Sequence, residues 1–185
     1  MPGASALKYS AVVLMTLFAL LGGLFAAGYA IADLSGRAAA LLIAAYAVPA
    51  VGLSVLAIIR PAVLGPVLVG LSVVVIVFND IDAAARLIPR DTYGPVGVVA
   101  VLMLAAAIGF LGLHRPLLAG VLLVALAIGQ AVAAVAGRDV AGGEPLGAVF
   151  SGSTGIVVIP LLVIGGLFLL AGRPPTHPAS VAPAH

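Results

Sequence analysis

Six long runs of apolar residues, almost free of charge, constrain this chain more than any other feature. They cover residues 10–32, 38–59, 61–78, 96–113, 116–136 and 155–171. A helix rises about 1.5 Å per residue, so about 20 apolar residues cross the hydrocarbon core of a bilayer. Open strands are excluded there because lipid cannot satisfy their backbone N–H and C=O groups. The runs therefore predict an all-α integral membrane bundle of six transmembrane helices.

The composition excludes a water-soluble domain. Of the 185 residues, 64% are hydrophobic and 8% are charged, whereas soluble domains carry about 25% charged residues. The net charge of +2 is too small to indicate a nucleic-acid partner. Cysteine is absent, which excludes disulfides and thiolate chemistry. Arg supplies seven of the eight basic residues, and Ala, Val and Gly dominate. This composition is typical of a GC-rich bacterial genome, so we expect a bacterial plasma (inner) membrane protein.

The first run has one feature of a secretory signal peptide, because Ala30-Ile31-Ala32 fits a small-x-small cleavage pattern. However, residues 10–32 are longer than an ordinary signal-peptide core and long enough to span a bilayer. We therefore expect a retained first helix. Residues 1–172 then form a single transmembrane domain. Residues 173–185, "RPPTHPASVAPAH", are a Pro-rich tail that we expect to be disordered and cytoplasmic.

The dipeptide Arg-Pro interrupts the apolar sequence three times, at Arg60, Arg115 and Arg173. Pro suits the first turn of a helix, where its missing N–H is not needed, and it disfavours helical geometry in the residue before it. Arg60-Pro61 and Arg115-Pro116 therefore predict that one helix ends and the next begins within one or two residues. The Arg side chains are then headgroup anchors on one side of the membrane.

The segments "LAIIRPAVLGPVLV" and "LGLHRPLLAGVLLV" start at Leu56 and Leu111 and match with an offset of 55 residues, the separation of Arg60 and Arg115. Two interpretations remain open. The match indicates either a duplicated helical hairpin, as in membrane proteins built from parallel repeats, or convergence on the same tight turn.

The charges divide unequally between the two predicted membrane sides. One side carries the basic residues that have no acidic neighbour in sequence, namely Lys8, Arg60, Arg115 and Arg173. The other side carries four Arg residues, each near an acid, and all six acidic residues. The count of Lys and Arg is equal, so the positive-inside rule does not decide the orientation. Because the unpaired charges mark the first side, we expect it, and both termini, to be cytoplasmic.

Two longer segments connect helices on the other side. In residues 79–95, Asn79 or Asp80 can cap a short interfacial helix between the third and fourth spans, with Asp82 and Arg86 paired on its wet face. This helix is either a lid over a cavity or a linker that shields helix ends. Residues 137–155 are either a re-entrant segment that lines a cavity or a Gly-rich surface loop.

Few polar side chains fall inside the predicted spans. Tyr46, Gln130 and Ser72 are the candidate ligand-binding residues, because a polar group in lipid needs a partner. Tyr46 and Gln130 can form a hydrogen-bonded pair beside a cavity, or each can bridge two helices. Small residues also form possible helix-contact faces. They are Gly22, Gly23, Ala26 and Ala27 in the first run, and Ala40, Ala44 and Ala47 in the second.

No catalytic, cofactor or metal-binding pattern is present, so we expect a protein that is not an enzyme, without cofactor or metal. We expect a non-catalytic accessory or assembly subunit of a larger membrane complex, whose partners are the lipid bilayer and either another membrane protein or further copies of this chain. The alternative is a small permease or lipid-handling carrier. Its outward-facing cavity would lie between two hairpins, one formed by the second and third helices and the other by the fourth and fifth. A lipid-modifying enzyme that uses the outer acidic and Arg residues is a third possibility.

Overall fold

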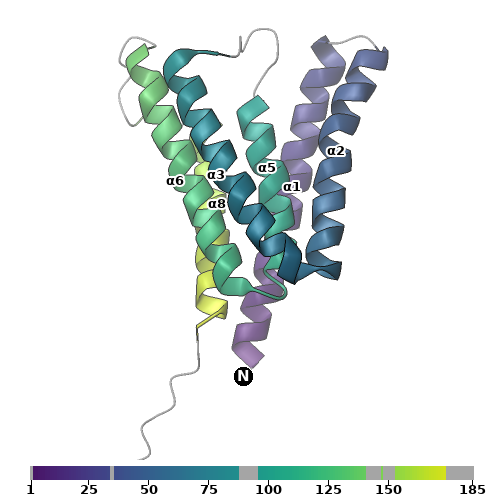
Figure 1. Cartoon of the computed structure of the whole chain (residues 1–185), viewed down its shortest axis with the longest axis vertical. Helices are drawn as coiled ribbons and strands as arrows, with labels where there is room; N and C mark the ends of the chain where they lie inside the picture. The colour runs from purple at the N-terminus through teal and green to yellow at the C-terminus, as the bar shows by residue number, and fades with distance from the viewer. Residues whose placement is uncertain (1, 34–35, 88–95, 141–146, 148–152, 174–185) are drawn as a thin grey trace, which may run out of the picture.

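The computed structural model describes residues 2–33, 36–87, 96–140, 147 and 153–173, and the helices are the only regular elements in these ranges. In chain order they are α1 (Pro2–Asp33), α2 (Gly36–Ile59), α3 (Pro61–Ala85), α5 (Val96–Leu111), α6 (Pro116–Val140) and α8 (Ser153–Ala171). Successive helices run in alternate directions, so the N-terminus, the α2–α3 junction, the α5–α6 turn and the end of α8 gather at one end of the bundle (Figure 1).

These helices confirm the all-α bundle that the apolar runs predict. Each run coincides with one helix, and most boundaries agree within a few residues. Five of the helices are long and apolar enough to cross a membrane. The exception is α5, whose 16 residues form the shortest of the six. The chain is therefore a helical membrane protein by the length and composition of its helices.

The first Arg-Pro junction has the predicted geometry. Helix α2 ends at Ile59 and α3 begins at Pro61, so Arg60 alone separates them. Arg60 has φ −132° and ψ 60°, outside the helical region, and its carbonyl accepts the N–H of Leu64 at 3.0 Å. Pro at the first helical position and a non-helical residue before it explain why the chain reverses within one residue.

The second junction is longer than predicted. Helix α5 ends at Leu111 rather than at Leu113, and four residues precede Pro116. The N–H groups of Leu113 and His114 donate to carbonyls three residues earlier, at 3.1 and 3.0 Å. This tightened last turn satisfies backbone groups that a regular helix end would leave unpaired.

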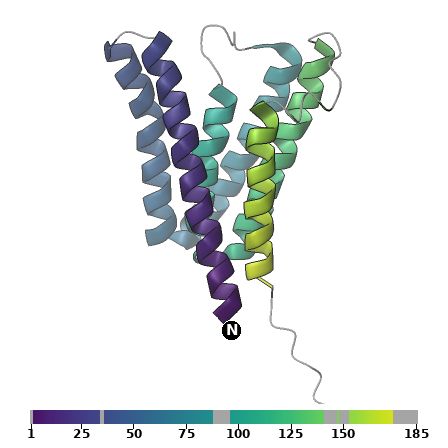
Figure 2. The ribbon, with the colours of Figure 1, turned by 180° about the vertical axis from the view of Figure 1, so that it is seen from behind.

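Helix α5 forms the centre of the core. It packs against α1, α2, α3 and α6, and the views from both sides show it between the other helices (Figures 1 and 2). Its fully buried side chains are Val101, Leu104, Ala105, Ala107, Ile108 and Leu111. Helix α5 can therefore be almost wholly apolar, because protein surrounds it on most sides.

Glycines let several helices approach α5 and one another closely. A Cβ on Gly109 would lie 2.6 Å from a side-chain carbon of Met15 in α1, and a Cβ on Gly112 would overlap the ring of Phe168 in α8. Helices α6 and α8 come closest, because a Cβ on Gly120 would lie 2.8 Å from the carbonyl oxygen of Gly165. Small residues at such crossings let backbones pack directly, which drives helix association in lipid.

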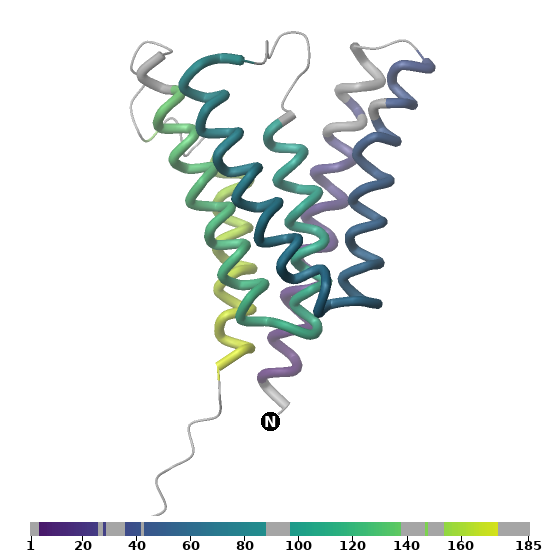
Figure 3. Tube along the Cα trace, in the orientation of Figure 1, coloured from purple at the N-terminus to yellow at the C-terminus, as the bar shows by residue number. Residues whose placement is uncertain are grey.

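The two Arg-Pro hairpins lie side by side. Helix α2 packs against α5, and α3 packs against α6, so each helix contacts its counterpart in the other hairpin. Figure 3 shows that α3 and α6 start at the same end and run in the same direction. This is the arrangement expected of parallel repeats, although convergent turns would allow it too.

The start of the segment between α3 and α5 differs from the prediction of an interfacial helix. Asn79, Asp80 and Asp82 belong to α3, which continues to Ala85, so no helix is capped at Asn79 or Asp80. Arg86 ends α3 in the left-handed conformation, with φ 50° and ψ 47°, and its N–H donates to the carbonyl of Asp82 at 2.8 Å. The sequence pattern did not predict this continuation of α3, because an amphipathic end of a long helix and a separate short helix have the same pattern. The rest of that segment, the greater part of residues 137–155, and the tail after Arg173 lie outside the described residues.

Candidate functional site

The three polar residues predicted to bind a ligand lie on three different helices. Tyr46 is half-buried on α2, Gln130 is half-buried on α6, and Ser72 is buried on α3. Helices α2 and α6 lie on opposite sides of α5 (Figures 1 and 2). Tyr46 and Gln130 are therefore not adjacent, and no hydrogen bond joins them within the described part of the chain. Ser72 faces the core between α3 and its neighbours.

Ser72 differs from Thr16 and Ser54, which also carry hydroxyl groups within the helices. Thr16 donates to the carbonyl of Val12 at 2.8 Å, and Ser54 donates to the carbonyl of Ala50 at 2.7 Å. Both hydroxyls are satisfied inside their own helices. Ser72 is only 1% exposed, and its Oγ has no hydrogen-bond partner. A buried polar group without a partner costs about 1–3 kcal/mol, so this hydroxyl is the stronger candidate for contact with a ligand or a water.

Asn79 lies two helical turns beyond Ser72 and also faces the core. It is 8% exposed, its Nδ2 has no partner, and its side chain packs on Gly97 at the start of α5, where a Cβ would overlap its Oδ1. The neighbouring Asp80 has one buried carboxylate oxygen without a partner as well. We call Ser72, Asn79 and Asp80 the α3 polar row. Sequence reasoning missed Asn79 as a core residue, although its spacing of seven from Ser72 places both on one helix face.

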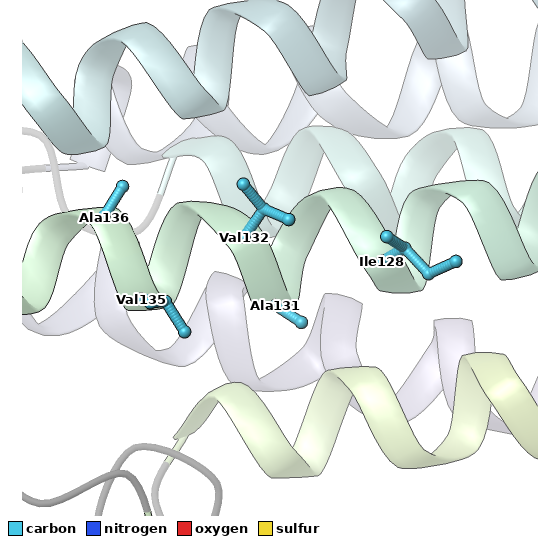
Figure 4. A pocket seen from close by; sticks show the side chains of 5 residues that line it. All are labelled: Ile128, Ala131, Val132, Val135 and Ala136. Atoms are coloured by element: carbon cyan, nitrogen blue, oxygen red, sulfur yellow. The ribbon is translucent and has the colours of Figure 1, made fainter.

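The α3 polar row lines neither of the two best-formed hollows of the described structure. One hollow of about 420 Å³ lies on the outer side of α6 and is lined by Ile128, Ala131, Val132, Val135 and Ala136 (Figure 4). A second, of about 470 Å³, lies on α1 beside Tyr9, Ser10, Val13 and Leu14. Each is lined by a single helix, so both are surface depressions, whereas ligand pockets are usually enclosed by several elements.

The predicted headgroup anchors lie together at the end of the bundle where the N-terminus lies (Figure 1). Arg60 precedes α3, Arg115 precedes α6, and Arg173 follows α8. All three are exposed. Lys8 is half-buried nearby, and its Nζ donates to the carbonyl of Leu113 in the α5–α6 turn at 3.2 Å. This contact, which the sequence does not reveal, ties α1 to that turn.

The acidic residues of the described helices lie towards the other end, on α1, α3 and α6. Asp80 and Asp82 are half-buried and Arg86 is exposed. Within the described residues, no three His, Cys, Asp or Glu side chains are grouped as a metal site would require. The described structure therefore offers apolar packing, one row of unpaired polar groups and one end that carries basic residues.

Comparisons with protein-family models, with curated proteins and with solved structures found no match to this chain.

Proposed function

We propose that this protein is a non-catalytic accessory or assembly subunit of a larger membrane complex, and that α2 is the helix that docks on its partner. The observation that carries the proposal is the unequal burial of the helices. In its most apolar stretch α2 has 6% of its residues buried, compared with 44% in α6. A bundle that leaves one helix so little covered has a surface free for another protein.

The residues on α2 support helix docking rather than lipid contact alone. Ala40, Ala44 and Ala47 recur at helical spacing and are all exposed, and a Cβ on Gly52 would meet nothing within 4 Å. Association of helices in lipid depends on close van der Waals packing, which small residues permit. A face meant only for lipid gains nothing from small side chains.

The docking face can be tested with a thiol, because the chain has no cysteine of its own. Ala44→Cys, coupled to a photoreactive maleimide in native membranes, should crosslink one protein in a defined ratio. Val163→Cys on α8, whose side chain is 55% exposed, is the matched control and should crosslink mainly lipid. Mass spectrometry identifies the products. Identical products from both positions, or none from Ala44→Cys, would contradict the subunit proposal.

The α3 polar row supports a second candidate function, the small permease or lipid-handling carrier. Ionisable groups within membrane spans often mark substrate paths, and the unpaired Asp80 oxygen lies within the α3 span beside Asn79. Gentle extraction followed by mass spectrometry of small molecules and lipids should then recover a retained compound. Asn79→Leu should abolish its retention, whereas Thr16→Val, which removes a hydroxyl already paired in its own helix, should not. Retention that survives Asn79→Leu would count against the carrier.

We further propose six membrane crossings in a bacterial plasma membrane, with both termini in the cytoplasm. The alternating helix directions support six crossings. The Lys and Arg residues that gather without acids at the end of the bundle near the N-terminus support a cytoplasmic location of that end. Topology reporters fused after Arg60 and after Asp91 should report opposite sides, with Arg60 cytoplasmic. If both reporters gave the same side, the chain would cross the membrane one time fewer than proposed.

A further inference from the structure

The end of the bundle near the N-terminus is basic and carries no acidic group in the described structure. The side chains concerned, which we call the basic end, are Lys8, Arg60, His114, Arg115 and Arg173. The described acids lie on the portions of α1, α3 and α6 that are towards the other end of the bundle. No ion pair therefore neutralises these side chains within the described residues, and their positive charge is available to a partner from outside the chain.

Arg115 is held at the junction of two helices. Its Nη1 lies 3.3 Å from the position that a Cβ on Gly65 would occupy, and Leu118 lies beside the same glycine at 3.4 Å. The guanidinium therefore lies over the first turns of α3, against a residue without a side chain. Five N–H donors in a planar fork make Arg suited to a phosphate group, and the exposed guanidinium of Arg115 can reach one from this place.

Lys8 is fixed beside the same turn from the α1 side. Its Nζ donates to the carbonyl of Leu113 and lies 5.4 Å from the centre of the Tyr9 ring. One hydrogen bond leaves two of the ammonium donors for other acceptors. Arg60 immediately precedes α3, the helix whose Gly65 the Arg115 side chain contacts. The fold thus brings three cations to one end of the bundle, and Lys8 is hydrogen-bonded to the turn that carries Arg115.

Exposed apolar side chains continue along the two helices that Arg60 and Arg115 precede. Val69 and Val73 on α3 and Val121 on α6 are exposed, by 38%, 55% and 55%. A ligand with a negatively charged phosphate and long acyl chains would match both features at once. An inorganic phosphate would contact only the cations and not the apolar surface.

We propose that the basic end binds an anionic phospholipid, with Arg115 as the main contact to the lipid phosphate and Lys8 and Arg60 as further cationic contacts. The acyl chains lie along the exposed sides of α3 and α6. The bound lipid bridges α3 to the α5–α6 turn and to α1, so it joins the Arg-Pro hairpins at the end where their turns meet. This inference does not depend on the proposed subunit function.

Native mass spectrometry of the full-length chain in a neutral detergent tests the lipid site. Phosphatidylglycerol, phosphatidylcholine and inorganic phosphate are added separately at equal concentration. The natural chain should retain phosphatidylglycerol at least about fivefold more than phosphatidylcholine. Arg115→Gln should reduce the phosphatidylglycerol adduct about fivefold, which corresponds to about 1 kcal/mol for one basic residue. Lys8→Gln is a second variant, with the same direction of effect, in case Arg115→Gln does not fold.

The control is Arg37→Gln, which removes an exposed charge from the start of α2 at the opposite end and should leave the adduct unchanged. Equal retention of the two lipids would overturn the proposal. An equal loss in Arg37→Gln would also overturn it, because the effect would then follow net charge alone. Adducts of inorganic phosphate as abundant as those of the lipid would show that the acyl chains contribute nothing, and would overturn the assignment to a lipid.

Discussion

The hairpins α2–α3 and α5–α6 have the same Arg-Pro junction, a Gly four residues after each Pro, and very different surroundings. Leu111 at the end of α5 is fully buried, whereas its counterpart at an offset of 55, Leu56 in α2, is 39% exposed. Gly120 faces the backbone of α8, whereas its counterpart Gly65 faces the end of the Arg115 side chain. Similar local sequence therefore reverses the chain at both Arg-Pro sites but does not give the two hairpins equal roles, because the neighbours of each hairpin decide what is buried.

Truncation of the two equivalent leucines should show the largest difference between the hairpins. Leu111→Ala should lower the free energy of unfolding by about 3 kcal/mol, because it leaves a cavity in the core. Leu56→Ala should lower it by less than about 1 kcal/mol, because lipid refills the space. Reversible unfolding in mixed micelles measures both values. Equal losses would mean that α2 is as well packed as α5.

The two equivalent glycines give a smaller but more local contrast. Gly120→Ala should cost about 1–3 kcal/mol, because its Cβ would lie against the Gly165 carbonyl and the Leu169 side chain, and backbone yields little. Gly65→Ala should cost less than about 0.5 kcal/mol, because a flexible Arg115 side chain can move aside. The same unfolding assay applies. A larger loss for Gly65→Ala would show that the close approach of α3 and α6 matters more than that of α6 and α8.

Ser72 provides the smallest test, because its counterpart in α6 is the fully buried Ala127. Ser72→Ala makes the two helices alike at this position. Because the buried hydroxyl of Ser72 has no partner, its removal should raise the free energy of unfolding by about 1 kcal/mol. Ser54→Ala, which removes a hydroxyl bonded within its own helix, should change the free energy of unfolding by less than about 0.5 kcal/mol. A loss in Ser72→Ala would instead indicate that a bound water or ligand satisfies Ser72, and would favour the carrier function.

The sequence predicted the helices well, but it did not predict how the polar residues are arranged. Apolar runs and Arg-Pro dipeptides placed all six helices, because span length and Pro geometry act locally. The pairing of Tyr46 with Gln130 depended on which helices are neighbours, and α2 and α6 are not. Asn79 was expected in a helix cap, because a polar residue after an apolar run has the same pattern whether the helix stops or continues.

The sequence by itself determined that this chain is a helical membrane protein, where its helices reverse, and that one end carries basic residues without acids. These properties follow from composition and short-range geometry. Only the tertiary structure decided that α5 is the central helix, that α2 is the least covered, and that Arg115 rests on Gly65. In a chain that is apolar on almost every helix face, hydrophobicity does not distinguish the buried side from the lipid side. The shape of small and large side chains at each crossing makes that choice, and it depends on residues far apart in sequence.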